Sequence, residues 1–326
     1  MTGLVYYTDR NPGIIRQRRG RGFTYINPEG NRVACRAERT RLAAMAVPPA
    51  YSDVWMSPYA NGHLQATGRD ARGRKQYRYH PEWRAQRDAQ KFDRLTNLAE
   101  GLPTLRRWVA SRLTGEVGEQ DTAIAAVLAL IDRAALRPGH PEYVRENDSY
   151  GATTLLSRHV EVKDHTVTLS FTAKGGKKVS KSLQGKRLAR VLHASADLPG
   201  PDLFSYFDAD GQLVCVRPEH LIETLNAVCG VGVTPKSLRT WAGTHAAFIA
   251  SRDVEGELTI KAMADAASDR LDNTPSIARN SYIHPQVLDL ASLTPGHRKK
   301  VLEKLPKDGP SELRQGEAAL SVFLKG

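Results

Sequence analysis

The sequence predicts an α+β protein with a small β-rich domain over residues 1–90 and a larger, mainly helical domain over residues 91–326. Short apolar stretches broken by Gly, Pro and Asn fill the first 80 residues, which is typical of strands and turns. Apolar residues at helical spacing dominate the rest, apart from one stretch with the period of a strand. A chain of 326 residues also exceeds the size at which one hydrophobic core usually stops growing. We therefore expect two domains.

The helical pattern begins at Trp83, and we expect this helix to end where the sequence EGLP interrupts the pattern. The domain boundary falls near residue 90. Two amphipathic helices are expected next, each with one apolar face toward a core, and Asp121 is a possible cap of the second. Their apolar positions are Leu105, Trp108, Val109 and Leu113 in the first, and Ile124, Val127, Leu128 and Ile131 in the second.

Residues 159–183 alternate with strand period and contain two turn signals, Lys163-Asp164-His165 and Gly175-Gly176. This pattern predicts a three-stranded antiparallel meander inside the helical domain. Further helices are expected around Leu188, from Pro218, and through Ile260 to Leu271. Thr before Pro at 234–235 and at 274–275 predicts two more helix starts, because Thr can cap and Pro suits the first turn.

The composition limits the partners and the compartment. The net charge is +12, and residues 1–90 hold 16 Lys and Arg against 7 Asp and Glu, an excess of nine. Such basicity points to a polyanion: DNA, RNA or anionic lipid. Three scattered cysteines give neither a disulfide framework nor a zinc motif, and we expect them to be buried in a reducing, cytoplasmic compartment. No apolar run suits a membrane span and no secretory signal is present.

Four segments match one known family. They are LRPGHPEY around Arg137, SFTAKGGKKVS around Lys174, TPKSLRTWAGTH around Arg239 and LDNTPSIARNSYIHP, which contains Tyr282. Together they resemble the catalytic domain of type IB DNA topoisomerases, in particular the short bacterial and poxvirus-like members. The N-terminal LQATGRDARGRKQYRYHPEW resembles the DNA-clamping domain of the same proteins.

The resemblance implies an enzyme that forms a clamp around duplex DNA and relaxes supercoils by nicking one strand, letting the duplex swivel and resealing it. Tyr282 would be the nucleophile, leaving a 3′-phosphotyrosine and a free 5′-hydroxyl. Arg137 and Arg239 would hold the non-bridging oxygens of the pentavalent state, since a guanidinium presents a planar, permanently charged fork. No metal, ATP or other cofactor is implied, and we expect a monomer without an obligate protein partner.

Three further residues complete the implied site. Lys174, at the glycine turn of the meander, would protonate the 5′-oxygen leaving group. Lys236 would contact DNA and assist proton delivery. Asn273 stands where the family commonly has a histidine, and its amide can donate to a phosphate oxygen without carrying charge.

Basic segments of the first domain are expected to bind phosphates. They include Arg16, Arg18, Arg19 and Arg21, and then Arg69, Arg72, Arg74, Lys75 and Arg78. In RKQYRYH, strand period puts Tyr77 and Tyr79 on one face and Gln76 and Arg78 on the other. The family resemblance places this strand in the major groove, while the alternative is a solvated basic edge strand.

Two other interpretations remain. A tyrosine recombinase uses the same nucleophile and two arginines, but usually has His three residues before the second arginine and His directly after it, where this chain has Lys236 and Thr240. A non-catalytic DNA-binding protein would need only the basic charge. A calcium loop at 208–219 is excluded by Leu213, where that loop requires Gly. The sequence assigns no function to the tail 291–326.

Overall fold

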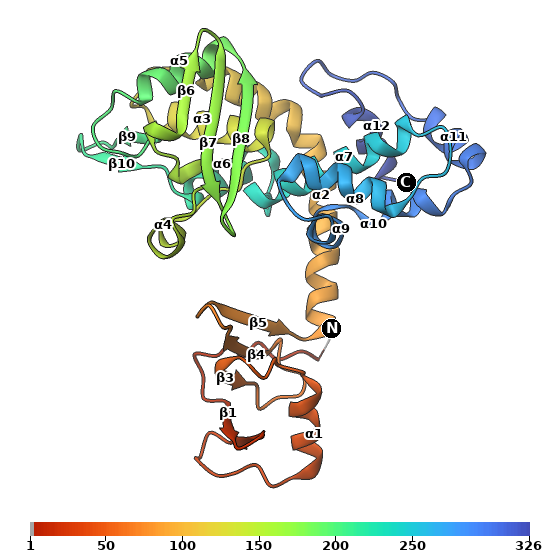
Figure 1. The fold of residues 1–326 in the computed structure, drawn as a ribbon. Coiled ribbons are helices and arrows are strands. Elements are labelled where there is room, and N and C mark those ends of the chain that lie inside the picture. Colours follow the sequence, from red (N-terminus) through yellow and green to blue (C-terminus); the bar gives the residue numbers. More distant parts are fainter. Residues whose placement is uncertain (1–2) are drawn as a thin grey trace. The chain divides into compact units, whose positions relative to one another are not determined.

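The computed structural model describes residues 3–326, and the chain divides into two compact units, residues 1–91 and 92–326 (Figure 1). The division falls inside one helix, α2 (Pro81–Arg112), so the chain passes from one unit to the other without a loop. The fold is α+β, with an antiparallel sheet in the first unit and a mainly helical second unit.

The first unit is a five-stranded antiparallel sheet in the order β2-β1-β3-β4-β5 with one helix beside it. Leu42 of that helix packs on Ile14, Val54, Met56 and Ala66 from the sheet. Strand β5 lies at the sheet edge. The elements are β1 (Ile14–Arg19), β2 (Gly22–Ile26), α1 (Arg36–Ala44), β3 (Ser52–Met56), β4 (Leu64–Arg69) and β5 (Lys75–Tyr79). Helix α1 is absent from the sequence-based prediction, because RAERTRLAA buries only one residue, Leu42.

Helix α2 corrects the predicted break at EGLP. It runs unbroken past Pro103, so the segments expected as separate helices form one. A proline inside a helix removes a hydrogen bond and costs about 3 kcal/mol. Burial offsets this cost, since the helix places Leu95, Leu98, Leu102 and Leu105 on one stripe at 0–1% exposure.

Helix α3 (Gln120–Ala134) is buried on all sides rather than on one face. Every residue from Thr122 to Ile131 is buried, which makes α3 the central helix of the second unit. The expected cap is also wrong. Glu119 occupies the N-cap without a side-chain hydrogen bond, and Asp121 lies in the first turn, where it pairs with Arg112 at 3.1 Å.

The predicted meander is confirmed as an antiparallel sheet in the order β6-β7-β8. Its strands are β6 (Val160–Lys163), β7 (Thr166–Ala173) and β8 (Lys177–Gln184), and α3 packs behind it (Figure 1). Short elements flank it: α4 (Pro141–Asn147), η1 (Ala152–Thr154), η2 (Ser157–His159), α5 (Lys186–Ser195), β9 (Ser205–Phe207) and β10 (Leu213–Cys215).

The predicted helix starts at Pro218, Pro235, Ile260 and Pro275 are confirmed. Thr234 and Thr274 each accept a hydrogen bond from the backbone N–H three residues on, as the Thr-Pro pattern predicts. Helices α7, α8 and α9 pack against one another (Figure 1). The helices are α6 (Pro218–Cys229), α7 (Pro235–Asp253), α8 (Ile260–Leu271), α9 (Pro275–Tyr282), α10 (Pro285–Asp289), η3 (Leu290–Ser292), α11 (Pro295–Glu303) and α12 (Glu317–Phe323).

The three cysteines are free, but only Cys229 is buried as expected, while Cys35 is exposed and Cys215 is half-buried. Across residues 3–326, no helix is long and apolar enough to cross a membrane. Within the same residues, no group of three His, Cys, Asp or Glu side chains is arranged to hold a metal ion.

Candidate active site

Arg239 lies on α7 with only 2% of its surface exposed and contacts the ends of two other helices. Its Nη1 donates to the carbonyl of Ala135, after α3, and its Nη2 donates to the carbonyl of Leu271, the last residue of α8, at 3.1 Å. Helix C-termini carry partial negative charge, so they stabilise the guanidinium there. The Nε hydrogen is buried without a hydrogen-bond partner among residues 3–326.

Tyr282 is the last residue of α9, and the Arg239 guanidinium lies 5.3 Å from its ring centroid. The backbone there is held against α7. Thr244 Oγ1 donates to the Tyr282 carbonyl at 3.1 Å and accepts from the His284 N–H at 3.1 Å. Gly243 makes this approach possible, because a Cβ at that position would lie 2.9 Å from the Tyr282 carbonyl oxygen.

The electrostatics of the site act on the Tyr282 phenol. Burial raises its pKa, but the charge and hydrogen bond of Arg239, followed by the charges of Lys236 and Arg137, lower it further than burial raises it. The pKa of Tyr282 therefore lies below its ordinary value of 10.0. A lowered pKa favours the phenolate, which is the nucleophilic form.

Arg137 follows the C-terminal end of α3, where Ala135 takes a left-handed conformation (φ 54°) and turns the chain. Its Nη2 donates to Asn273 Oδ1. Asn273 is fixed by its own backbone, since its N–H donates to the Ser268 carbonyl at 3.2 Å and its carbonyl accepts from Ser268 Oγ at 3.0 Å. This pair joins two predicted site residues that are 136 positions apart.

The Asn273 amide nitrogen, Nδ2, is buried and has no hydrogen-bond partner among residues 3–326. Leaving such a donor unpaired costs free energy, and most buried donors in native proteins are paired. An unpaired donor beside Arg137 is therefore suited to an incoming acceptor such as a phosphate oxygen.

Lys174 is placed apart from this buried group. It lies exposed in the β7–β8 turn, where Gly175 (φ 82°) and Gly176 (φ 77°) take conformations that favour glycine, and its ammonium lies 6.0 Å from the Tyr143 ring centroid. Its neighbour Ala173, however, lines a small cavity together with Arg137 and Arg239. Lys174 itself does not line that cavity.

The remaining candidates of the second unit differ in role. Lys236 is exposed in the first turn of α7, and its charge acts on Tyr282. His284 caps α10 by accepting from the Gln286 N–H at 3.2 Å, and it packs edge-on against Phe92. In this position His284 holds the start of α10 and packs against α2.

In the first unit, Tyr77 and Tyr79 of β5 stack with ring centroids 6.2 Å apart and are 51% and 38% exposed. This confirms that they share a face. Basic residues around them have acidic partners: Arg69 pairs with Asp53 at 3.6 Å and Lys75 with Asp9 at 2.5 Å.

The Asp70 carboxylate organises the turn between β4 and β5. It pairs with Arg74 at 2.7 Å, accepts from the Arg72 N–H at 2.9 Å and accepts from Gln76 Nε2 at 3.0 Å. The Arg74 guanidinium holds the pKa of Asp70 at about 2. Arg72 keeps its exposed guanidinium available, whereas Arg16 does not, because it donates to the carbonyls of Val47, Pro48 and Tyr51.

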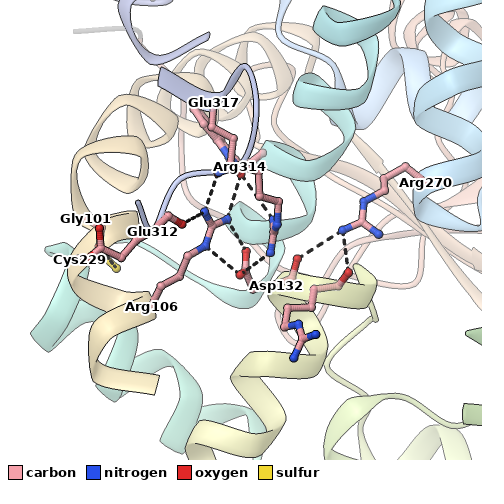
Figure 2. Close-up of polar contacts among 10 residues, drawn as sticks. Gly101, Arg106, Asp132, Cys229, Arg270, Glu312, Arg314 and Glu317 are labelled. Atoms are coloured by element: carbon pink, nitrogen blue, oxygen red, sulfur yellow. Dashed lines mark hydrogen bonds and ion pairs between the residues drawn. The ribbon is translucent and has the colours of Figure 1, made fainter. Parts of the chain in front are cut away.

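Sequence reasoning missed a buried ion-pair network behind α7. Arg106 donates to Asp132 at 3.0 Å and to Glu317 at 2.6 Å, and Arg314 contacts both carboxylates (Figure 2). Trp241, two residues after Arg239, donates its indole N–H to Glu317 at 2.9 Å. The sequence offers one indication of this network, because the N–H of a buried Trp usually needs a hydrogen-bond acceptor. It does not indicate which acidic residue is that acceptor.

Comparisons with known proteins agree with this arrangement. Residues 22–70 match the family model of the bacterial DNA topoisomerase IB N-terminal domain, and residues 80–273 match that of the eukaryotic DNA topoisomerase I catalytic core. The second match contains Arg137, Lys174, Arg239 and Asn273 but ends before Tyr282.

Curated relatives give the same result. The DNA topoisomerase 1B of Acanthamoeba polyphaga mimivirus is 27% identical over 298 residues, which cover 87% of this chain and 88% of that protein. The DNA topoisomerase 1B of vaccinia virus (strain Copenhagen) is 22% identical over 258 residues, covering 74% of this chain and 76% of that protein.

Proposed function

The chain belongs to the type IB DNA topoisomerase family, and we propose that it relaxes supercoiled duplex DNA through a 3′-phosphotyrosyl intermediate formed by Tyr282. The observation that carries this proposal is the position of Tyr282 under the guanidinium of a buried arginine, with its pKa lowered despite burial. A phenol in this setting is prepared to attack phosphorus.

In the proposed cleavage step, the Tyr282 oxygen forms a bond to phosphorus and the bond from phosphorus to the 5′-oxygen breaks. Negative charge grows on the non-bridging oxygens. Arg137, Arg239 and the unpaired Asn273 amide supply donors for it. Preorganised donors of this kind usually lower the activation free energy more than any other single contribution from the enzyme.

The leaving 5′-oxygen needs a proton, and we assign its delivery to Lys174, with Lys236 assisting. What supports this assignment is that Lys174 is exposed on the β7–β8 turn next to Ala173, and that within residues 3–326 it forms no ion pair.

Religation is the reverse step, in which the 5′-hydroxyl attacks the phosphotyrosine and Tyr282 leaves. The bond energy stays in the phosphotyrosine, so the proposed cycle needs no ATP. The donors of Arg137, Arg239 and Asn273 take the role that a metal ion would otherwise have.

Duplex DNA is the proposed partner, and the first unit is its proposed clamping domain. The exposed, stacked Tyr77 and Tyr79 and the exposed Arg72 support contact through β5 and the turn before it. We propose that the protein acts as a monomer.

A tyrosine recombinase is the nearest alternative. One assay distinguishes topoisomerase activity from recombinase activity. The test is incubation with supercoiled plasmid in EDTA without ATP. We expect relaxation of both positive and negative supercoils and a denaturant-resistant protein–DNA adduct, both abolished in Tyr282→Phe. Strict dependence on magnesium or ATP, or recombined products without relaxation, would overturn the proposal. A non-catalytic DNA-binding protein would give no adduct.

A further inference from the structure

A second cavity in the 92–326 unit, of about 670 Å³, lies outside the group around Tyr282. Its walls come from the end of α3, from β8, from α7 and α8, and from the segment before α12. None of its lining residues lines the small cavity beside Arg137 and Arg239. It is therefore distinct from the candidate active site.

Four cationic side chains line this cavity: Arg133, Lys181, Arg270 and Arg314. Two of them have carboxylate partners, Lys181 with Asp272 at 2.9 Å and Arg314 with Asp132 at 2.6 Å. The hydrogen bonds of the other two go to carbonyls. Arg133 donates to Gln184 O. Arg270 donates to the carbonyls of Arg133 at 2.9 Å and Asp132 at 3.5 Å.

A carbonyl oxygen can accept a hydrogen bond from a guanidinium N–H group, but it carries no full negative charge to balance the guanidinium. Asp269 is the carboxylate on the cavity wall, and burial lowers the pKa of His245 there, which favours its neutral form. Burial and the nearby charge of Arg314 also lower the pKa of Arg133 and of Arg270, and the charge of Asp132 offsets this shift only in part. Arg133 and Arg270 each lie near the charge of Arg314 with no carboxylate of residues 3–326 in direct contact, and a bound anion would supply that compensation.

The rest of the wall is apolar. Ala242, Ala246 and Ile249 line it from one face of α7, since positions four and three apart share a helix face. The cavity is also separated from Lys174 along the sheet. The lining residue Lys181 lies four residues after the start of β8, and Lys174 precedes that start, so at roughly 3.3 Å per residue the two are about 13 Å or more apart along the sheet.

We propose that this cavity binds a small anion with two or more linked phosphate groups. Guanidinium forks match phosphate oxygens in pairs, and three of them with one ammonium suit a ligand that carries several charges. The volume exceeds what a single phosphate fills, and cavities of this size are common for small ligands. The inference is independent of how Tyr282 cleaves DNA.

The test is calorimetric titration of the full chain with pyrophosphate and with tripolyphosphate, without DNA and at fixed ionic strength. Arg133→Gln/Arg270→Gln should weaken binding about tenfold or more, because charged hydrogen bonds are lost. The matched control is Arg36→Gln/Arg39→Gln, which removes the same charge from exposed positions of α1 in the first unit and should bind as the parent does. No binding by the parent chain, or equal loss in both variants, would refute the site.

A second variant guards against a folding defect in the arginine pair. Ala246→Phe keeps every charge and fills the cavity from the α7 wall, so it should also abolish binding. Its thermal unfolding without ligand reports whether the fold is intact. If Ala246→Phe folds and binds like the parent, the anions bind elsewhere and the proposal fails.

Discussion

The indole of Trp241 donates a 2.9 Å hydrogen bond to the carboxylate of Glu317, which ties the helix that carries Arg239 to α12. Glu317 is fully buried and is also bound by Arg106 (Figure 2). The tail beyond residue 291 is thereby part of the catalytic unit's core. Sequence reasoning left its role open.

Glu317→Gln should destabilise the chain by about 3 kcal/mol, because it leaves the mostly buried Arg106 charge and the half-buried Arg314 charge with less compensation. Chemical denaturation measures the change. Lys325→Gln is the control, since it removes only the exposed pair with Glu100 and should be nearly neutral. Equal stability of Glu317→Gln and the parent would show that the network contributes little.

The same network predicts acid sensitivity. Burial opposes ionisation of Glu317, but the hydrogen bond and charge of Arg106 outweigh it and lower the pKa below the ordinary 4.5. A lowered carboxyl pKa in the folded state gives stability that is present above the unfolded value and is lost as the pH falls through the folded value. The parent should therefore lose stability below about pH 4.5, and Glu317→Gln should lose less over that range. Parallel pH profiles would contradict this.

Tyr282 should ionise below its ordinary pKa of 10.0, and Lys236→Gln should move its pKa upward because one of the charges that favour the phenolate is removed. The difference in phenolate absorbance between the parent and Tyr282→Phe isolates this group from the other tyrosines. The same difference is taken in the Lys236→Gln background. Because DNA is absent, the result does not depend on any role of Lys236 in proton delivery. An unchanged pKa in the variant would show that Lys236 has no electrostatic effect on the phenol.

Arg72→Gln should reduce the slope of log affinity for duplex DNA against log salt by about one, since one phosphate contact and its released counterion are lost. Arg16→Gln is the contrasting variant. Its guanidinium is already bound by three carbonyls, so the slope should stay the same while stability falls. If only Arg16→Gln flattens the slope, the DNA surface of the first unit has been misassigned.

Lys174→Ala should slow cleavage of ordinary DNA by about a hundredfold to ten-thousandfold, as expected for loss of a general acid. DNA with a 5′-bridging sulfur at the scissile bond needs no such proton, because the sulfur leaves as a stable anion. The lysine variant should therefore cleave it nearly as fast as the parent. Arg137→Ala, which loses charge stabilisation, should be slow on both substrates. Rescue of the arginine variant alone would reverse the two roles.

Local signals made parts of this fold predictable. The strand period with its two turns predicted the meander, and the Thr-Pro pairs predicted the starts of α7 and α9. Tertiary burial overrode local signals elsewhere. Pro103 does not end α2, and α3 is buried all round because other elements enclose it.

The candidate site likewise has residues that the sequence predicted and contacts that it did not predict. Arg137, Arg239, Asn273 and Tyr282 were predicted from their motifs, and the structure brings them together. Contacts between distant segments, such as those of Thr244 and Glu317, left no local pattern in the sequence. They depend on which helices meet, and that is decided only by packing.

The guanidinium of Arg239 binds the ends of α3 and α8 and also faces Tyr282. The cation that activates the proposed nucleophile is in place only when three helices have come together. A chain that is incompletely folded carries Tyr282 as an ordinary phenol. Under the proposed chemistry such a chain does not cleave DNA, so cleavage by Tyr282 depends on the assembly of these three helices.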